Sequence, residues 1–124
     1  MIQHKTIVTI IDNSGAKTAL CVRVLGGYKK KQAFIGDLIL VSIKKLKIKL
    51  NKLNIKLKTV FKALVIKTIL FNKKDIGFKF KFKNNSIILL DNQNNPLFTR
   101  VNDFVLKKLK NKYYKLITIS LNYV

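Results

Sequence analysis

Short runs of apolar and β-branched residues, each ended by a turn signal, follow one another in the first part of the chain. Thr6 to Ile11 predicts a strand that leads into a corner at Asp12–Gly15. Ala16 to Leu25 predicts a second, mostly buried strand that ends at Gly26-Gly27, and Ile35 to Ile43 predicts a third. Asp and Asn side chains cap their own turns, and Gly allows the positive φ of a sharp corner, so we expect tight turns between these strands.

Lysine alternates with aliphatic residues from Lys45 to Lys58. A period of two places the lysines on one face of a β-ribbon and the aliphatic side chains on the other. We expect this ribbon to turn near Asn51–Asn54, because Asn tolerates turn geometry. A half-buried hairpin with a hydrated face is the ordinary interpretation, but the density of lysine favours a face that follows phosphates.

Further strands and turns follow the ribbon. Lys58 to Thr68 predicts a strand, and Asn92 to Pro96 predicts a turn. Between them, Phe78, Phe80 and Phe82 alternate with lysines. Aromatic residues interleaved with lysines can stack on bases, but three Phe on one strand face are more typical of a barrel core. We favour the core.

The last part of the chain predicts a short helix. Asp103 is of a residue type that caps helices, and Val105, Leu106 and Leu109 form an apolar stripe. Lysines in or near the last turns would interact favourably with the helix dipole; they are Lys107, Lys108, Lys110 and Lys112. Many short strands with turns between them are typical of a barrel. We therefore predict a mainly β protein of one domain, with a small barrel over about 1–101 and a helical segment over about 102–124.

The charge balance points to a class of partner. The chain holds 26 Lys and Arg against 5 Asp and Glu, a formal net charge of +21. A domain this basic repels itself unless a polyanion neutralises it. Nucleic acid is the first candidate, an anionic membrane surface the second, and a hydrated surface without a partner the third. An A/T-rich genome would also enrich Lys, Ile and Asn, so part of the excess is expected to be drift.

Candidate chemistry is sparse. One His, one Cys and five acidic residues spread along the chain give no metal quartet and no nucleophile–base pair. We expect His4 to be exposed, Cys21 to be a small buried filler and the acidic residues to lie at turns. The protein is thus predicted to be no enzyme and to use no cofactor and no metal. No apolar stretch approaches the ~20 residues of a membrane span, so no membrane insertion is expected.

An ordered set of motifs makes the sequence recognisable. The motifs occur in one order, with no insertion or deletion needed between them: Met1-Ile2-Gln3, Asp12–Lys17, Cys21–Gly27 and Gly36-Asp37. Together they resemble the L-fourteen family of large-subunit ribosomal proteins, in its bacterial and organellar type. Lys58–Thr68 is similar to a strand of that family, and Thr99-Arg100 to its Thr-Arg motif. The chain departs from the family at Phe98, where the family has Gly, and at Asp103-Phe104, where it has Gly-Pro.

The resemblance implies a structural protein of the large ribosomal subunit, with a five-stranded barrel, a projecting β-ribbon and a small helical C-terminal part. It implies as partners large-subunit rRNA, neighbouring large-subunit proteins and, across an intersubunit bridge, small-subunit rRNA. The residues expected to contact rRNA are Lys17, Arg23, Lys29, Lys30, Lys31, Lys44, Lys45, Lys47 and Lys49. The face implied for the bridge, or for a ribosome-silencing factor, holds Thr99, Arg100, Lys112, Lys115 and Thr118.

Two other functions stay open. A free cationic β-barrel could bind single-stranded nucleic acid through the three Phe named above. A membrane-surface protein would need a basic amphipathic helix, which only residues 104–112 approach. No secretory or Arg-rich leader pattern opens the sequence, so we expect synthesis inside an organelle. We favour a mitochondrion over a plastid or the cytoplasm of an A/T-rich bacterium.

Overall fold

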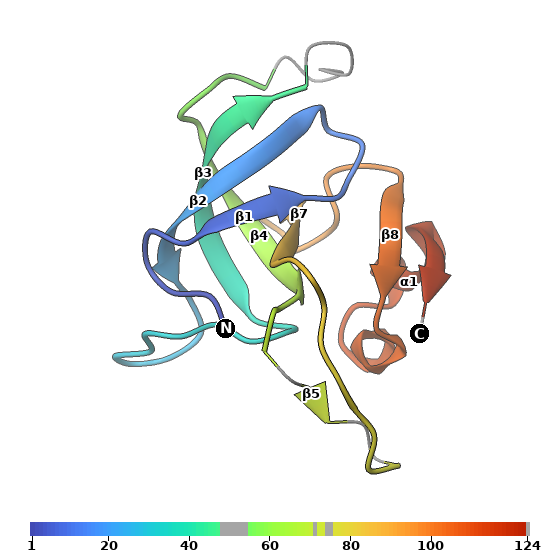
Figure 1. Ribbon diagram of the computed structural model, residues 1–124. Coiled ribbons are helices and arrows are strands. Elements are labelled where there is room, and N and C mark those ends of the chain that lie inside the picture. Colours follow the sequence, from blue (N-terminus) through green and yellow to red (C-terminus); the bar gives the residue numbers. More distant parts are fainter. Residues whose placement is uncertain (48–54, 71, 74–75, 124) are drawn as a thin grey trace.

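Five strands close into a β-barrel. The structure, a computed structural model, describes residues 1–47, 55–70, 72–73 and 76–123. Around the barrel the order is β1, β2, β3, β4 and β7; β1 and β7 are parallel, and the other neighbours are antiparallel (Figure 1). The strands are β1 (Ile7–Ile10), β2 (Ala16–Val24), β3 (Leu38–Leu46), β4 (Val60–Lys67) and β7 (Ser86–Leu90).

The other elements lie outside the barrel (Figure 1). Two very short strands form an antiparallel hairpin, and the C-terminal segment holds two parallel strands joined through a 3-10 helix and an α-helix. They are β5 (Asn72–Lys73), β6 (Lys79–Phe80), β8 (Val101–Val105), η1 (Lys107–Asn111), α1 (Tyr114–Ile119) and β9 (Ser120–Tyr123). In the described part of the chain, neither helix has the length and apolar character needed to cross a bilayer.

Two predicted corners set the starts of β2 and β3. Gly15 and Gly36 have φ angles of 87° and 90°, where a side chain is disfavoured. At the first corner the Asp12 carboxylate accepts the backbone N–H of Ser14 at 3.1 Å. At the second, the Asp37 carboxylate accepts the N–H of Phe34 at 2.8 Å. The tight turns predicted at both places are therefore confirmed.

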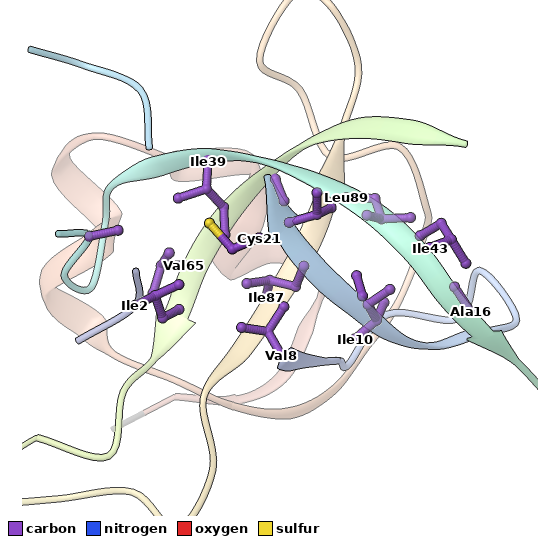
Figure 2. Close-up of a cluster of buried hydrophobic side chains, with 14 of the residues drawn as sticks. Ile2, Val8, Ile10, Ala16, Cys21, Ile39, Ile43, Val65, Ile87 and Leu89 are labelled. Atoms are coloured by element: carbon purple, nitrogen blue, oxygen red, sulfur yellow. The ribbon is translucent and has the colours of Figure 1, made fainter. Parts of the chain in front are cut away.

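Alternate side chains from all five strands fill the barrel. Figure 2 shows such residues converging on the interior: Val8, Cys21, Ile39, Val65 and Ile87. Cys21 is fully buried, as predicted for a small filler, and burial raises the pKa of its thiol. His4 is exposed, also as predicted. β2 is half-buried and not mostly buried, because Lys17, Val22 and Arg23 face outward and are exposed.

A second apolar cluster joins the barrel wall to the C-terminal segment. β4 and β7 are buried on both faces, since Val65 points inward while Leu64 and Ile88 point outward. The outward side chains pack in one cluster with Leu109 of η1 and Leu116 of α1. Strands with two buried faces carry continuous apolar runs, which accounts for the Ser-Ile-Ile-Leu-Leu sequence of β7. The C-terminal segment therefore covers the β4–β7 side of the barrel.

The β-ribbon predicted over Lys45–Lys58 is found only in part. β3 ends at Leu46, and residues 48–54, with the predicted turn at Asn51–Asn54, lie outside the described residues. Residues 56–59 turn back toward the barrel, where the N–H of Ile43 donates to the carbonyl of Thr59 at 3.0 Å. Because of this turn, the predicted alternation of exposed lysines and buried aliphatic side chains does not continue to Lys58. Leu57, predicted on the aliphatic face, is 54% exposed.

The prediction that Phe78, Phe80 and Phe82 pack in the core is wrong. Phe78 is 69% exposed, and the other two are half-buried outside both apolar clusters. The physical reason is that β6 spans just Lys79–Phe80 and pairs with β5 away from the barrel, so no barrel strand carries these side chains inward. Phe80 and Phe82 contact each other edge to face, with ring centroids 5.5 Å apart.

The predicted helix N-cap at Asp103 is wrong as well. Asp103 lies within β8, where its carboxylate forms a 2.5 Å ion pair with Lys67 of β4. This stretch is a strand because Val101 and Val105 face the second cluster and β9 pairs with it. The helical residues start later, at Lys107 in η1 and at residue 114 in α1. The acidic residue at position 75, also expected at a turn, lies outside the described residues.

Candidate nucleic-acid interface

One group of predicted RNA contacts gathers where β2 begins and β3 ends. We call Lys17, Lys44, Lys45 and Lys47 the Lys17 group. Thr18 pairs with Lys45 across the two strands, and the register shifts beside this pair. An irregularity of this kind re-aims side chains, which accounts for the exposure of both Lys44 and Lys45. Lys17 is exposed too, whereas Lys47 is half-buried and donates its backbone N–H to Gly15 at 2.6 Å.

A second group lies at the other end of the same strand pair. This Lys29 group consists of Arg23, which lies near the end of β2, and of Lys29, Lys30 and Lys31 in the loop that follows. Lys29 and Lys31 are exposed, and the Lys29 ammonium lies 5.3 Å from the Tyr28 ring centroid. Lys30 differs from them, because its ammonium pairs with Asp37 at 2.8 Å. The loop therefore offers fewer unpaired charges than its sequence indicates.

The two groups are separated by the length of β2. At the usual rise of about 3.3 Å per residue, the six steps from Lys17 to Arg23 span about 20 Å. The C-terminal segment packs mainly against β4 and β7, although Leu38 at the start of β3 also contacts the second apolar cluster (Figure 1). Lys49, the last predicted rRNA contact, lies outside the described residues.

The Asp12–Gly15 corner holds the Thr99-Arg100 motif in place. Asn13 donates from its side-chain amide to the Thr99 hydroxyl at 3.3 Å and accepts the N–H of Arg100 at 3.4 Å. Asp12 also forms a β-bridge with Val101. Thr99 and Arg100 are exposed. Two motifs far apart in the sequence thus build one surface.

The rest of the predicted bridge face is spread along the C-terminal segment. Lys115 donates to the Asn95 side chain at 3.3 Å, and the Thr118 hydroxyl donates to the carbonyl of Lys115 at 2.8 Å. Both residues belong to α1, and β9, which follows it, pairs Ser120 with the residue after Arg100. Lys112 is the C-cap residue that follows η1, and it lines the same cleft as the Phe34–Asp37 turn. The structure therefore separates Lys112 from the Thr99-Arg100 end of this segment.

Comparison with known families decides the class of protein. The family described as ribosomal protein L14p/L23e matches residues 1–124, which is the whole chain. The chain belongs to this family. An L14-family protein is a structural protein of the large ribosomal subunit, and the family is not enzymatic. In the described part of the chain, no cluster of three or more His, Cys, Asp or Glu could hold a metal ion.

Sequence reasoning missed one exposed feature of this L14-family barrel. A row of outward-facing residues crosses four strands, because Ile7 pairs with Leu20, Leu20 with Ser42 and Ser42 with Val60. Ile7 is 65% exposed and Val60 is 59% exposed. We call these four residues the outer row. Its signal in the sequence was that β1, β2 and β4 carry apolar residues at outward as well as inward positions.

Proposed function

We propose that this L14-family protein binds large-subunit rRNA through the Lys17 group and the Lys29 group. One observation carries the proposal: basic side chains lie exposed at both ends of β2–β3. Among the described residues of these groups only Lys30 forms a close ion pair with an acid, while Lys47 interacts with Asp12 at longer range. Lysine contacts with phosphates position a protein on RNA without reading its sequence. Affinity is therefore expected to fall steeply with salt.

The exposed surface around Thr99 and Arg100 supports a second contact. Together with Lys115 and Thr118 it is proposed to meet small-subunit rRNA in an intersubunit bridge, or a ribosome-silencing factor in its place. Lys112 is proposed as a contact of the same partner at the other end of the segment. The support is that these side chains are exposed on a surface held by Asn13 and Asn95.

The outer row is proposed as the contact for a neighbouring large-subunit protein. Exposed aliphatic side chains offer no charge or hydrogen bond to a phosphate, whereas protein interfaces bury aliphatic side chains. Replacing Val60 by Lys adds a positive charge and should leave rRNA affinity unchanged or higher. If the row meets a protein, Val60→Lys should still weaken incorporation into the subunit.

The compartment and the domain boundaries are proposals too. We propose that the protein works in mitochondrial ribosomes, because its enrichment in Lys, Ile and Asn fits an A/T-rich genome such as that of an organelle. We also propose that residues 1–124 form one domain, since the second apolar cluster combines barrel strands with the C-terminal segment.

Sucrose-gradient sedimentation of a native extract at low and then high salt tests the main proposal. The protein is expected to migrate with the large subunit at both salt concentrations. Replacing Lys17 and Lys45 by Gln should release it at lower salt than the unaltered protein. Gln at Lys5 and Lys110, exposed lysines outside both groups, serves as the control.

Migration near the top of the gradient would contradict a ribosomal role in rRNA binding. It would favour the free cationic barrel that binds single-stranded nucleic acid. Release at the same salt for the Lys17-group variant and the control would remove that group from the rRNA contact.

A further inference from the structure

A cleft of about 720 Å³ lies where the turn before β3, the β5–β6 hairpin and η1 meet. Its volume is within the usual range for small-ligand sites, about 300–1,000 Å³. Much of its lining is apolar and comes from all three parts of the chain: Phe34, Ile35, Ile76, Phe80, Leu106 and Leu109. None of the residues predicted to contact large-subunit rRNA lines this cleft, whereas Lys112, proposed above for the intersubunit bridge, does.

The turn before β3 is built to hold η1 close. Gly36 has a φ of 90°, and a Cβ there would lie 3.2 Å from the Leu109 side chain. The Asp37 carboxylate accepts the N–H of Phe34, and the Asp37 N–H donates to the carbonyl of Phe34 at 3.0 Å. The backbone of Phe34 is thus fixed while its side chain stays 50% exposed. An exposed aromatic residue with a fixed backbone suits stacking, because only side-chain freedom is lost on binding.

The rim of the cleft is positively charged. Lys107, Lys108 and Lys112 line it, and all three are exposed. Asp37 is the acidic residue among the described lining residues, and Lys30 meets its charge at 2.8 Å. An anionic occupant would therefore encounter lysines without a free carboxylate to repel it.

We propose that this cleft binds an unpaired nucleotide of an RNA strand, with the base on Phe34 and Phe80 and the flanking phosphates near the three lysines. Unpaired bases stack on aromatic side chains, and basic residues follow their backbone. The amides of Asn72 and Asn111 also line the cleft. The Asn72 amide donates one N–H to the carbonyl of Leu70 at 2.8 Å, which leaves its second N–H and its oxygen for a base edge. This inference rests on the proposed function, to which it adds a site for single-stranded rRNA.

A matched pair of phenylalanines tests the stacking. Phe34 lines the cleft and Phe104 does not, yet both are 50% exposed. The probe is a dye-labelled single-stranded RNA pentamer, followed by fluorescence anisotropy with the full chain. Phe34→Ala is expected to weaken pentamer binding by about fivefold or more, and Phe104→Ala to leave it unchanged. An abasic pentamer and an RNA duplex should bind the Phe34 variant as well as they bind the unaltered protein.

A matched pair of lysines on η1 tests the phosphate contacts. Lys108 lines the cleft and Lys110 does not, although both are exposed. Lys108→Gln should weaken both the normal and the abasic pentamer, and more than Lys110→Gln does. Circular dichroism spectra of all four variants are expected to match the unaltered protein, because the substituted side chains are exposed.

Three outcomes would overturn the inference. The first is equal loss in the Phe34 and Phe104 variants, and the second is a pentamer bound no more tightly than its abasic form. The third is a Glu- and Leu-containing peptide of equal charge that displaces the pentamer and shows the same dependence on Phe34, which would assign the cleft to a protein segment. In these cases duplex binding would still support the proposed function. Loss of all RNA binding in the unaltered protein would instead overturn the proposed function.

Discussion

At the scale of single residues, one ion pair ties the barrel to the C-terminal segment. The Lys67 ammonium lies 2.5 Å from the Asp103 carboxylate and 5.1 Å from the Phe82 ring centroid. The Lys67 side chain is 9% exposed, while that of Asp103 is 35% exposed. The two partners therefore depend on each other unequally, because water can reach the carboxylate but hardly reaches the ammonium.

This asymmetry predicts different costs for removing either partner. Asp103→Asn leaves a buried ammonium without its counter-charge and should lower the free energy of unfolding by about 1–3 kcal/mol. Lys67→Met keeps the volume of the side chain and leaves a carboxylate that water can solvate, so it should cost less than about 1 kcal/mol. Urea denaturation of both variants measures the difference. Equal costs, or a larger cost for Lys67→Met, would contradict this account.

A buried acid predicts a pH dependence. Asp12 is 2% exposed, and its carboxylate accepts the backbone N–H of Ser14 at 3.1 Å and that of Leu89 at 3.0 Å. Burial raises its pKa above the usual 3.8, although the hydrogen bonds oppose the shift. The native state thus keeps this proton to higher pH than the unfolded chain does. The stability that Asp12 contributes is complete below pH 3.8 and is lost as the pH rises through the raised pKa.

Asp12→Asn removes this titration and is the matched comparison. The stability of the unaltered protein relative to Asp12→Asn should be greatest at about pH 3 and should decline toward about pH 7. Chemical denaturation of both proteins across this range, at one salt concentration, measures the difference. A relative stability that increases with pH would show that the hydrogen bonds outweigh burial and lower the pKa.

At the scale of elements, local patterns were enough for the barrel but not for the C-terminal segment. β1, β2 and β4 follow from apolar runs between turn residues, and they lie close to their predicted positions. Val101–Val105 could not be predicted in this way, because it becomes a strand by pairing with Ser120–Tyr123 beyond two intervening helices. A strand that depends on a distant partner has no signature in its own sequence.

The second apolar cluster predicts that α1 contributes to the stability of the whole barrel. Leu116 is fully buried against side chains that β4 and β7 direct outward. Leu116→Ala should lower the free energy of unfolding by about 2–5 kcal/mol, as expected for a cavity in a packed core. Tyr114 lies on the same helix but is 64% exposed. Tyr114→Ala should therefore change the free energy of unfolding by less than about 0.5 kcal/mol.

Thermal unfolding of both variants measures these effects, with the far-ultraviolet circular dichroism signal of the β-strands as the readout. If the two parts form one domain, Leu116→Ala should shift a single transition. A barrel that melts at an unchanged temperature after Leu116→Ala would mean that the C-terminal segment unfolds separately.

At the scale of the whole molecule, the exposure of most lysines could be predicted from residue type alone, but their grouping could not. The charge of +21 gives no indication that Lys30 is neutralised by Asp37 or Lys67 by Asp103. The cleft beside η1 was also beyond prediction, since its lining comes from three separate parts of the chain. What the sequence does support is a polyanion as partner, because so few acids cannot neutralise so many lysines.

The distribution of charge predicts how RNA affinity responds to salt. Each phosphate contact that is lost should reduce the slope of log affinity against log salt concentration by about 0.7–0.9. Gln at both Lys29 and Lys31 should therefore reduce the slope by about 1.4–1.8. Lys30→Gln alone should reduce it by less, because the Lys30 ammonium already pairs with Asp37 at 2.8 Å.

Filter binding of the protein to an rRNA fragment at several salt concentrations measures these slopes. Gln at both Lys17 and Lys45 should give the same reduction as the Lys29–Lys31 double variant, since both pairs are exposed. Gln at Lys5 and Lys110 removes equal charge outside both groups and should change the slope by much less. Equal slopes for all three double variants would mean that binding depends on net charge alone, and that the positions of the lysines on β2 and β3 do not matter.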